Sequence, residues 1–272
     1  MGISILLTIH NKERILSEIL DSLFKNSSTN IKEYIFVLDG CTDNSERILT
    51  DFILNYLPNN VTYKLLHASN VFETKANNIG LREVTQQYVI IVQDDMKITE
   101  FNWDFRLTYP MKKYSDVWAV TARTALNFDP YTREFLDAME GPVGHRYKNF
   151  TFPRNELYIR SIINRGPLAI DMSKLLEVGL FDEDMPGVQG WDDAELCYRM
   201  AMLKNWKCGS FWIDYYSPLE WGKSRGSNEI RTFIEDQTRK NEDYFISKYG
   251  KDFILKQHIV ETRIINESEY QS

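Results

Sequence analysis

Two adjacent carboxylates, Asp94 and Asp95, follow an unbroken apolar run from Tyr88 to Val92, with Gln93 between. The run is too short to span a bilayer but has the length of a strand that is buried on both faces of a parallel sheet. Open α/β sheets bind ligands at the carboxyl ends of their strands. Two acids placed there repel each other unless a cation compensates. The pattern therefore favours a divalent-metal and nucleotide site over a solvated turn.

Acidic residues also occur at the ends of other expected strands and at the start of an expected helix. Asp39 ends the apolar run Tyr34–Leu38, Asp192 and Asp193 open an amphipathic segment, and Glu220 follows a later apolar run. Carboxylate oxygens suit Mg²⁺ and Mn²⁺, and such an ion makes a diphosphate a good leaving group. Because the ends of parallel strands share one edge of a sheet, sequence separation does not prevent these acids from meeting.

The elements that must position these acids alternate between strand and helix. This alternation predicts an α/β fold with a mostly parallel central sheet, right-handed crossovers and helices on both faces. The expected strands cover residues 3–8, 34–38, 61–66 and 88–92, with helical periodicity after each of the first two and over 75–84.

The pattern changes after Asp95. Strands are expected at 118–121, 168–171 and 208–213, and helices begin near Ser173 and Asp192. The aromatic stretch from Asn127 to Arg160 is interrupted by proline and glycine, and its length predicts a mobile cover over the site. We expect residues 1–225 to form the main domain and residues 226–272 to form a helical extension packed on it.

Bulk composition limits the possible functions. The 272 residues are 43% hydrophobic and 26% charged, as in an ordinary globular protein, and the net charge of −7 argues against a nucleic-acid binder. The three cysteines match no zinc or disulfide spacing. With no signal-peptide pattern and no transmembrane stretch, a cytoplasmic location is expected, and peripheral membrane contact stays open.

Six segments, in order, resemble the family 2 glycosyltransferases, which are inverting enzymes with the GT-A (Rossmann-like) fold that use nucleotide sugars. Together the segments extend over roughly residues 3–225. They are Ser4–Asn11, Leu38–Asn44, Lys75–Gly80, Gln93–Asp95, Gly179–Glu183 and Asp192–Arg199.

The resemblance implies a set of residues that bind the nucleotide-sugar donor. Thr8 and Asp39 would hold the nucleobase and ribose. Asp94 would lie on the ribose and diphosphate side, in the family's Asp-x-Asp motif, whose first position is glutamine here. The full donor set is Thr8, Asp39, Lys75, Asn78 and Asp94.

The resemblance also implies metal, base and acceptor positions. Asp95 matches the ligand of Mn²⁺ or Mg²⁺, and Glu220 is the candidate to replace a histidine that many members use as a further ligand. Asp193 matches the general base, Asp192 stands where glutamate is more usual, and Trp191 lines the acceptor pocket. Because Asp193 opens a helix, we expect the helix dipole to favour its ionised form.

Two other functions remain open. A nucleotidyltransferase that makes nucleotide sugars would use similar metal-binding acids, but that class usually has a glycine-rich loop after the first strand, and His10 to Ile15 contains no glycine. The other is a catalytically inactive carbohydrate-binding protein of the same fold. The combined presence of Asp39, Asp95 and Asp193 argues against that alternative.

Overall fold

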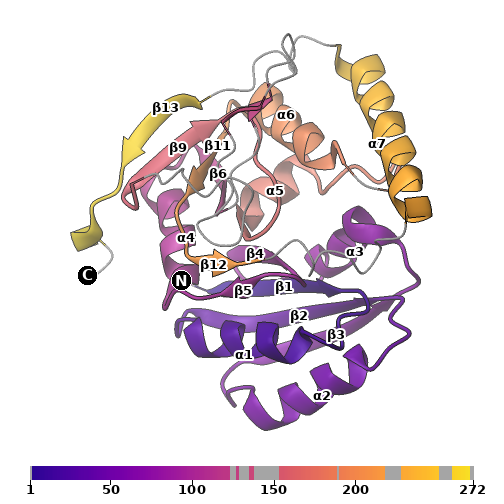
Figure 1. Ribbon diagram of the computed structural model, residues 1–272. Helices are drawn as coiled ribbons and strands as arrows, with labels where there is room; N and C mark the ends of the chain where they lie inside the picture. The colour runs from indigo at the N-terminus through magenta and orange to yellow at the C-terminus, as the bar shows by residue number, and fades with distance from the viewer. Residues whose placement is uncertain are drawn as a thin grey trace.

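A mixed nine-stranded sheet, with helices on both faces, organises the described part of the chain (Figure 1). The order of its strands is β13-β9-β11-β6-β10-β4-β1-β2-β3. The computed structural model describes residues 2–122, 127–128, 135–137, 153–188, 190–217, 228–250 and 259–269.

The first half of the sheet is parallel, and the second half is mixed. Strands β3, β2, β1 and β4 pair in parallel, whereas β10 runs antiparallel between β4 and β6. The strands of the main sheet are β1 (Ile3–Ile9), β2 (Ile31–Asp39), β3 (Thr62–Ala68), β4 (Tyr88–Gln93), β6 (Val117–Thr121), β9 (Glu156–Arg160), β10 (Leu168–Asp171), β11 (Lys207–Phe211) and β13 (Ile259–Ile264). Two short ribbons pair β5 (Lys97–Ile98) with β12 (Tyr215–Tyr216), and β7 (Asn127–Phe128) with β8 (Phe135–Asp137).

The helices divide between the two faces of the sheet. One apolar cluster packs α1, α2 and α4 on the side chains of one face, and a second packs α3, α5 and α6 on the other. In β4, Ile90 belongs to the first cluster and Ile91 to the second, and both are buried. The helices are α1 (Leu16–Asn26), α2 (Ser45–Tyr56), α3 (Phe72–Leu81), α4 (Trp103–Lys113), α5 (Met172–Val178), α6 (Asp192–Lys204), α7 (Asn228–Tyr249) and the 3₁₀ turn η3 (Glu267–Glu269).

The C-terminal region differs from the helical extension expected from the sequence. Helix α7 lies beside α6, where Phe245 and Tyr249 contact the ring of Tyr198, but β13 joins the edge of the main sheet antiparallel to β9 (Figure 1). Strand β13 was missed because its partner is distant in sequence. None of the helices in the described ranges combines the length and the hydrophobicity needed to cross a bilayer.

Candidate functional site

The carboxyl ends of β1, β2 and β4 meet at one edge of the sheet, as expected for parallel strands. The register places Thr8 of β1 opposite Gln93 of β4. His10 then links the neighbouring strand ends: its backbone N–H donates to Asp94 Oδ2 at 2.8 Å, and its Nδ1 lies 2.6 Å from the carbonyl oxygen of Asp39. A carbonyl oxygen only accepts, so this contact assigns the ring proton to Nδ1.

Asp39 fixes the start of α3. Its two carboxylate oxygens accept hydrogen bonds from the backbone N–H groups of Val71, at 2.6 Å, and Phe72, at 2.9 Å. Phe72 has a φ of 67°, a left-handed conformation that is rare for a bulky residue and costs about 1–3 kcal/mol. The buried carboxylate of Asp39 stabilises this strained backbone at the helix N-terminus.

Thr8 and Lys75 lie in different environments. The hydroxyl of Thr8 donates to Asn77 Oδ1 at 2.9 Å, which ties the end of β1 to the buried face of α3. Lys75, on the same helix, is exposed to solvent. Thr8 therefore lies at the strand ends that carry Asp39 and Asp94. The charge of Lys75 instead lowers the pKa of Glu183, in the turn before α6.

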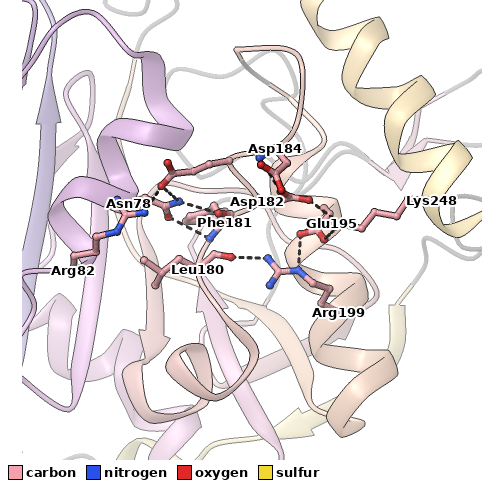
Figure 2. Close-up of a pocket in the computed structure, with 10 residues that line it drawn as sticks. Asn78, Arg82, Leu180, Phe181, Asp182, Asp184, Glu195, Arg199 and Lys248 are labelled. Carbon is pink, nitrogen blue, oxygen red and sulfur yellow. Dashed lines mark hydrogen bonds and ion pairs between the residues drawn. The ribbon is translucent and has the colours of Figure 1, made fainter.

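Asn78 faces the turn before α6. Its Nδ2 donates to the Phe181 carbonyl and to Glu183 Oε1, both at 2.8 Å, and its Oδ1 accepts from the Phe181 N–H at 3.2 Å (Figure 2). The side chain is fully buried. The structure thus places Asn78 in contacts that hold the turn against α3, apart from the strand ends that carry Asp39 and Asp94.

The carboxylate of Asp94 is paired within the protein. Its Oδ1 lies 3.4 Å from Lys12 Nζ, and the side chain is 17% exposed. Burial raises the pKa of Asp94 from its ordinary value of 3.8 to about 7, while Lys12 lowers it and the neighbouring Asp95 raises it. The strand end is therefore a place where additional positive charge would be favourable.

This electrostatic environment fits a metal ion that arrives with a diphosphate. Such an ion needs only one or two protein carboxylates, because substrate phosphates and waters supply the remaining ligands. Asp95, beside Asp94, can serve as that carboxylate. No cluster of three or more His, Cys, Asp or Glu side chains suited to a metal occurs within the described residues, and Glu220 lies outside them.

Arg165, which no sequence motif marks, connects three carboxylates. Its Nη2 lies 2.7 Å from Asp192 Oδ2, and its Nε lies 3.2 Å from Asp193 Oδ1 and 3.4 Å from Glu73 Oε1. The Phe181 ring centroid is 5.2 Å from the guanidinium. This single arginine, which precedes β10, joins α3 to the start of α6.

The two acids that open α6 have different surroundings. Asp192 is 1% exposed, pairs with Arg165 and accepts a short hydrogen bond from the Thr74 hydroxyl. The side chain of Asp193 is 18% exposed, and its Oδ2 accepts from the Arg165 backbone N–H at 3.2 Å. Asp192 is thus a buried anchor, whereas Asp193 retains access to ligands.

Burial determines the proton affinity of Asp193. It raises the pKa of Asp193 from 3.8 to about 7, against the lowering by Arg165, and Asp192 and Glu73 raise it further. Burial therefore outweighs the preference for the ionised form that the helix dipole supplies. A carboxylate with a pKa near 7 is a better base at neutral pH than an ordinary aspartate.

A cavity of about 320 Å³ is lined both by the start of α6 and by Gln93 at the carboxyl end of β4. Gln93, which immediately precedes Asp94 and Asp95, donates from Nε2 to Glu73 Oε1 at 2.8 Å. Within the described chain, three buried polar atoms at this cavity have no hydrogen-bond partner: Arg165 Nη1, Asp192 Oδ1 and Asp193 Oδ1. The lining residues are Glu73, Gln93, Ile162, Asn164, Arg165, Gly190, Trp191, Asp192, Asp193 and Ala194.

Trp191 is fixed at the wall of this cavity. It has a φ of 67° and immediately precedes α6, and its ring centroid lies 5.5 Å from that of Phe245 in α7. Asn241 of α7 holds the preceding loop, because its Oδ1 accepts from the Gly187 N–H at 2.6 Å and its Nδ2 donates to the Gly190 carbonyl at 2.8 Å.

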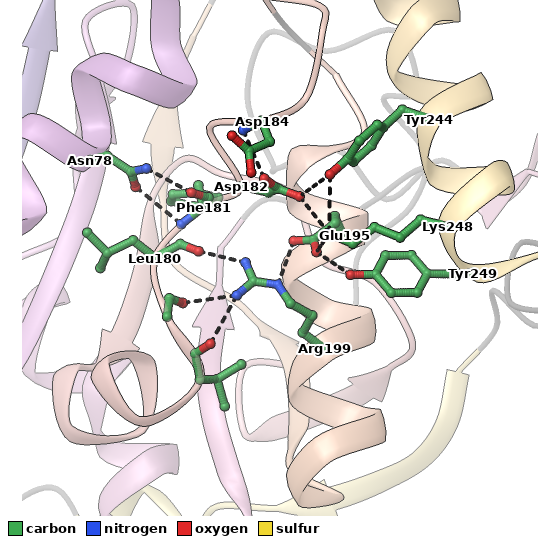
Figure 3. A network of polar contacts seen from close by, with 12 residues as sticks. Asn78, Leu180, Phe181, Asp182, Asp184, Glu195, Arg199, Tyr244, Lys248 and Tyr249 are labelled. Atoms are coloured by element: carbon green, nitrogen blue, oxygen red, sulfur yellow. Dashed lines mark hydrogen bonds and ion pairs between the residues drawn. The ribbon is translucent and has the colours of Figure 1, made fainter.

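A second cavity, of about 520 Å³, shares no lining residue with the first (Figure 2). Lys248 of α7 reaches Asp182 at 2.9 Å and Glu195 of α6 at 3.6 Å, and the Tyr249 hydroxyl donates to Glu195 Oε1 at 2.7 Å (Figure 3). Arg199 Nε pairs with Glu195 Oε2 at 2.7 Å. These charges satisfy one another, so the network anchors α6 between α7 and the turn.

The expected cover from Asn127 to Arg160 lies mostly outside the described residues. Its described parts are the ribbon of β7 and β8 and residues 153–160, which include β9. Strand β9 pairs with β11 and β13 in the main sheet, so this last portion belongs to the fixed framework.

Three solved structures have a fold similar to that of this chain. Staphylococcus aureus TarS (residues 1–349) has a TM-score of 0.57 and 14% identity, covering 93% of this chain and 74% of that one. The mannosyltransferase PcManGT from Pyrobaculum calidifontis, in complex with GDP-Man and Mn²⁺, has a TM-score of 0.63 and 15% identity, with 90% and 64% covered. GalNAc-T7, with UDP, GalNAc and Mn²⁺, has a TM-score of 0.62 and 16% identity, with 92% and 51% covered.

Sequence comparison gives the family. No curated protein sequence matches the chain significantly. The family model described as glycosyl transferase family 2 matches residues 4–173, from β1 to the start of α5 and thus more than half of the chain. The protein is therefore a glycosyltransferase and belongs to glycosyl transferase family 2.

Proposed function

We propose that the protein transfers a sugar, with inversion, from a nucleotide-diphosphate sugar to an acceptor hydroxyl, with Asp193 as the general base. One observation carries the proposal: the 320 Å³ cavity places Asp193 in the same chamber as Gln93, the residue directly before Asp94 and Asp95. A base and a diphosphate-binding edge are the two parts that such a displacement needs on opposite sides of the sugar.

The donor would bind along the edge formed by β1, β2 and β4. Thr8 and Asp39 would hold the nucleoside, Asp94 would lie on the diphosphate side, and Lys75 belongs to the proposed set through its motif on α3. Asn78 belongs to the proposed donor-binding set through its motif, although its hydrogen bonds hold the turn at Phe181 against α3. PcManGT and GalNAc-T7 were solved with Mn²⁺.

We assign Asp95 to the metal ion, with Glu220 as a further candidate ligand. A bound Mn²⁺ or Mg²⁺ would neutralise charge on the leaving diphosphate. Lys12, which already pairs with Asp94 at 3.4 Å, would add positive charge at the same edge.

In the reaction, Asp193 accepts the proton of the acceptor hydroxyl. The acceptor oxygen forms a bond to the anomeric carbon as the bond from that carbon to the diphosphate breaks. The proton ends on Asp193 and the electron pair on the nucleoside diphosphate. A pKa near 7 lets Asp193 be ionised before the transfer and protonated after it.

The acceptor side favours a hydroxyl-bearing ligand. Arg165 Nη1 needs an acceptor and Asp192 Oδ1 needs a donor, and a sugar hydroxyl provides both functions. The Trp191 ring offers an apolar surface at the same cavity. These features support a glycan or another polyol as the acceptor.

Product analysis tests this function. The protein is first screened against a panel of nucleotide sugars with Mn²⁺ by thermal shift, because a ligand that binds the native state raises the melting temperature. The stabilising donor is then incubated with candidate acceptors. We expect a glycoside of inverted anomeric configuration and a nucleoside diphosphate. A nucleotide sugar with pyrophosphate would indicate a nucleotidyltransferase, and the absence of any product would indicate an inactive binding protein.

A further inference from the structure

Arg165 is held rigidly between elements that are far apart in the sequence. It is 4% exposed, and its guanidinium contacts carboxylates from α3 and α6. The next residue, Gly166, has a φ of 91°, and a side chain there would collide with the Gln93 amide. The close approach of this backbone to β4 fixes the place from which Arg165 extends.

Asp193 receives two separate contacts from this one residue. Its Oδ1 lies 3.2 Å from Arg165 Nε, and its Oδ2 accepts from the Arg165 backbone N–H at 3.2 Å. The contact on Oδ1 is an ion pair without a hydrogen bond, and the contact on Oδ2 is a hydrogen bond; together they orient the carboxylate toward Arg165. Arg165 also forms a shorter ion pair with Asp192, in which Nη2 lies 2.7 Å from Oδ2.

We propose that Arg165 is the positioning residue of the base: it orients the Asp193 carboxylate and holds it in the ionised form that accepts the acceptor proton. This inference rests on the proposed function. Arg165 supplies the cation in a cluster that also contains three acids. The groups that face Asp193 are Arg165 from the loop before β10, Glu73 from α3, and Asp192 and the Cys197 thiol from α6.

The charge balance of the cluster explains why the arginine is needed. Burial and the two neighbouring acids all favour the protonated form of Asp193, and Arg165 is the group that opposes them. An opposite charge at this distance lowers a carboxyl pKa by about 1–3 units. Without Arg165, the base would stay protonated at neutral pH and could not accept a proton.

Two substitutions separate the charge of Arg165 from its geometry. Arg165→Gln removes the charge, so the acidic limb of the kcat–pH profile should move upward by about 1–3 pH units, with activity recovering at alkaline pH. Arg165→Lys keeps a cation but loses the planar guanidinium with its several N–H donors. The acidic limb of the kcat–pH profile should therefore stay near its wild-type position, while kcat at alkaline pH falls. A purely structural ion pair would instead lower activity equally at every pH.

A carbon-13 NMR titration of the Asp193 carboxyl measures the same effect without turnover. We expect the Asp193 pKa to rise in Arg165→Gln and to change little in Arg165→Lys. If Arg165→Gln does not fold, the double variant Glu73→Gln/Arg165→Gln removes one charge of each sign. A smaller rise is expected in it, because Glu73 itself raises the pKa of Asp193 but by less than Arg165 lowers it.

An unchanged Asp193 titration in the variants without the arginine would overturn the inference. So would a kcat–pH profile that keeps its shape. If the wild-type protein transfers no sugar from any donor, the proposed function fails, and the carboxyl titration still reports whether Arg165 controls the ionisation of Asp193.

Discussion

Replacing Asp193 by asparagine should stabilise the protein at alkaline pH. The folded state raises the pKa of this carboxyl from 3.8 to about 7 because the group is buried. Folding therefore favours the protonated form, and ionisation of Asp193 in the fold is costly above pH 7. Asparagine has nearly the same shape and can still accept from Arg165, but it has no charge to bury.

The size of the effect follows from the two pKa values. The penalty is absent below pH 3.8, grows as the pH rises to about 7, and is constant above it. At about 1.4 kcal/mol for each pH unit, the full penalty is at most about 4 kcal/mol. The stability gap between Asp193→Asn and wild type should widen by about 2–3 kcal/mol from pH 5 to pH 8.

Urea denaturation at pH 5 and pH 8 measures this gap. Asp192→Asn is the matched control: Asp192 pairs with Arg165 at 2.7 Å and accepts from Thr74, so this variant should lose stability at both pH values. An Asp193→Asn protein no more stable than wild type at pH 8, or a gap equal at both pH values, would refute the account of this cluster.

Two further variants test the supports of the site. Asp39→Ala leaves the two N–H groups at the start of α3 without their acceptor, so we expect a loss of about 1–3 kcal/mol in stability, measured by denaturation, together with weaker donor binding by calorimetry. Asn241→Ala frees the loop before Trp191, so the KM for acceptor should rise while donor affinity stays within about twofold. Unchanged acceptor kinetics would show that this loop is fixed without Asn241.

The N-terminal half of the fold was predictable from sequence because its signals are local. Each buried strand is a short apolar run, and each following helix has its own periodicity. The same logic placed Asp39 and Asp94 at one edge, since parallel strands must share it. The parallel pattern ends at β4, and beyond it the pairing partners are distant, so β9 and β13 gave no comparable signal.

Helix α4 and Arg165 were missed for different reasons. Pro110 lies inside α4, and a proline normally argues against a helix interior. Arg165 has no motif spacing of its own, and its meaning comes from carboxylates that only the tertiary fold brings together. Asn78 is the opposite of Arg165, because its motif predicted a contact with the nucleotide sugar. In the structure its side-chain amide instead donates a hydrogen bond to Phe181, more than a hundred residues later in the chain.

The central claim is that Asp193 is the base, and single-turnover and steady-state kinetics of Asp193→Asn test it most directly. The substitution removes the basic oxygen while keeping size and hydrogen-bonding capacity. We expect kcat to fall by about 10²-fold or more at pH 7.5, with donor affinity by calorimetry within about twofold of wild type. An Asp193→Asn enzyme that turns over like the wild type would contradict the account, and Asp192 would be the next carboxylate to test.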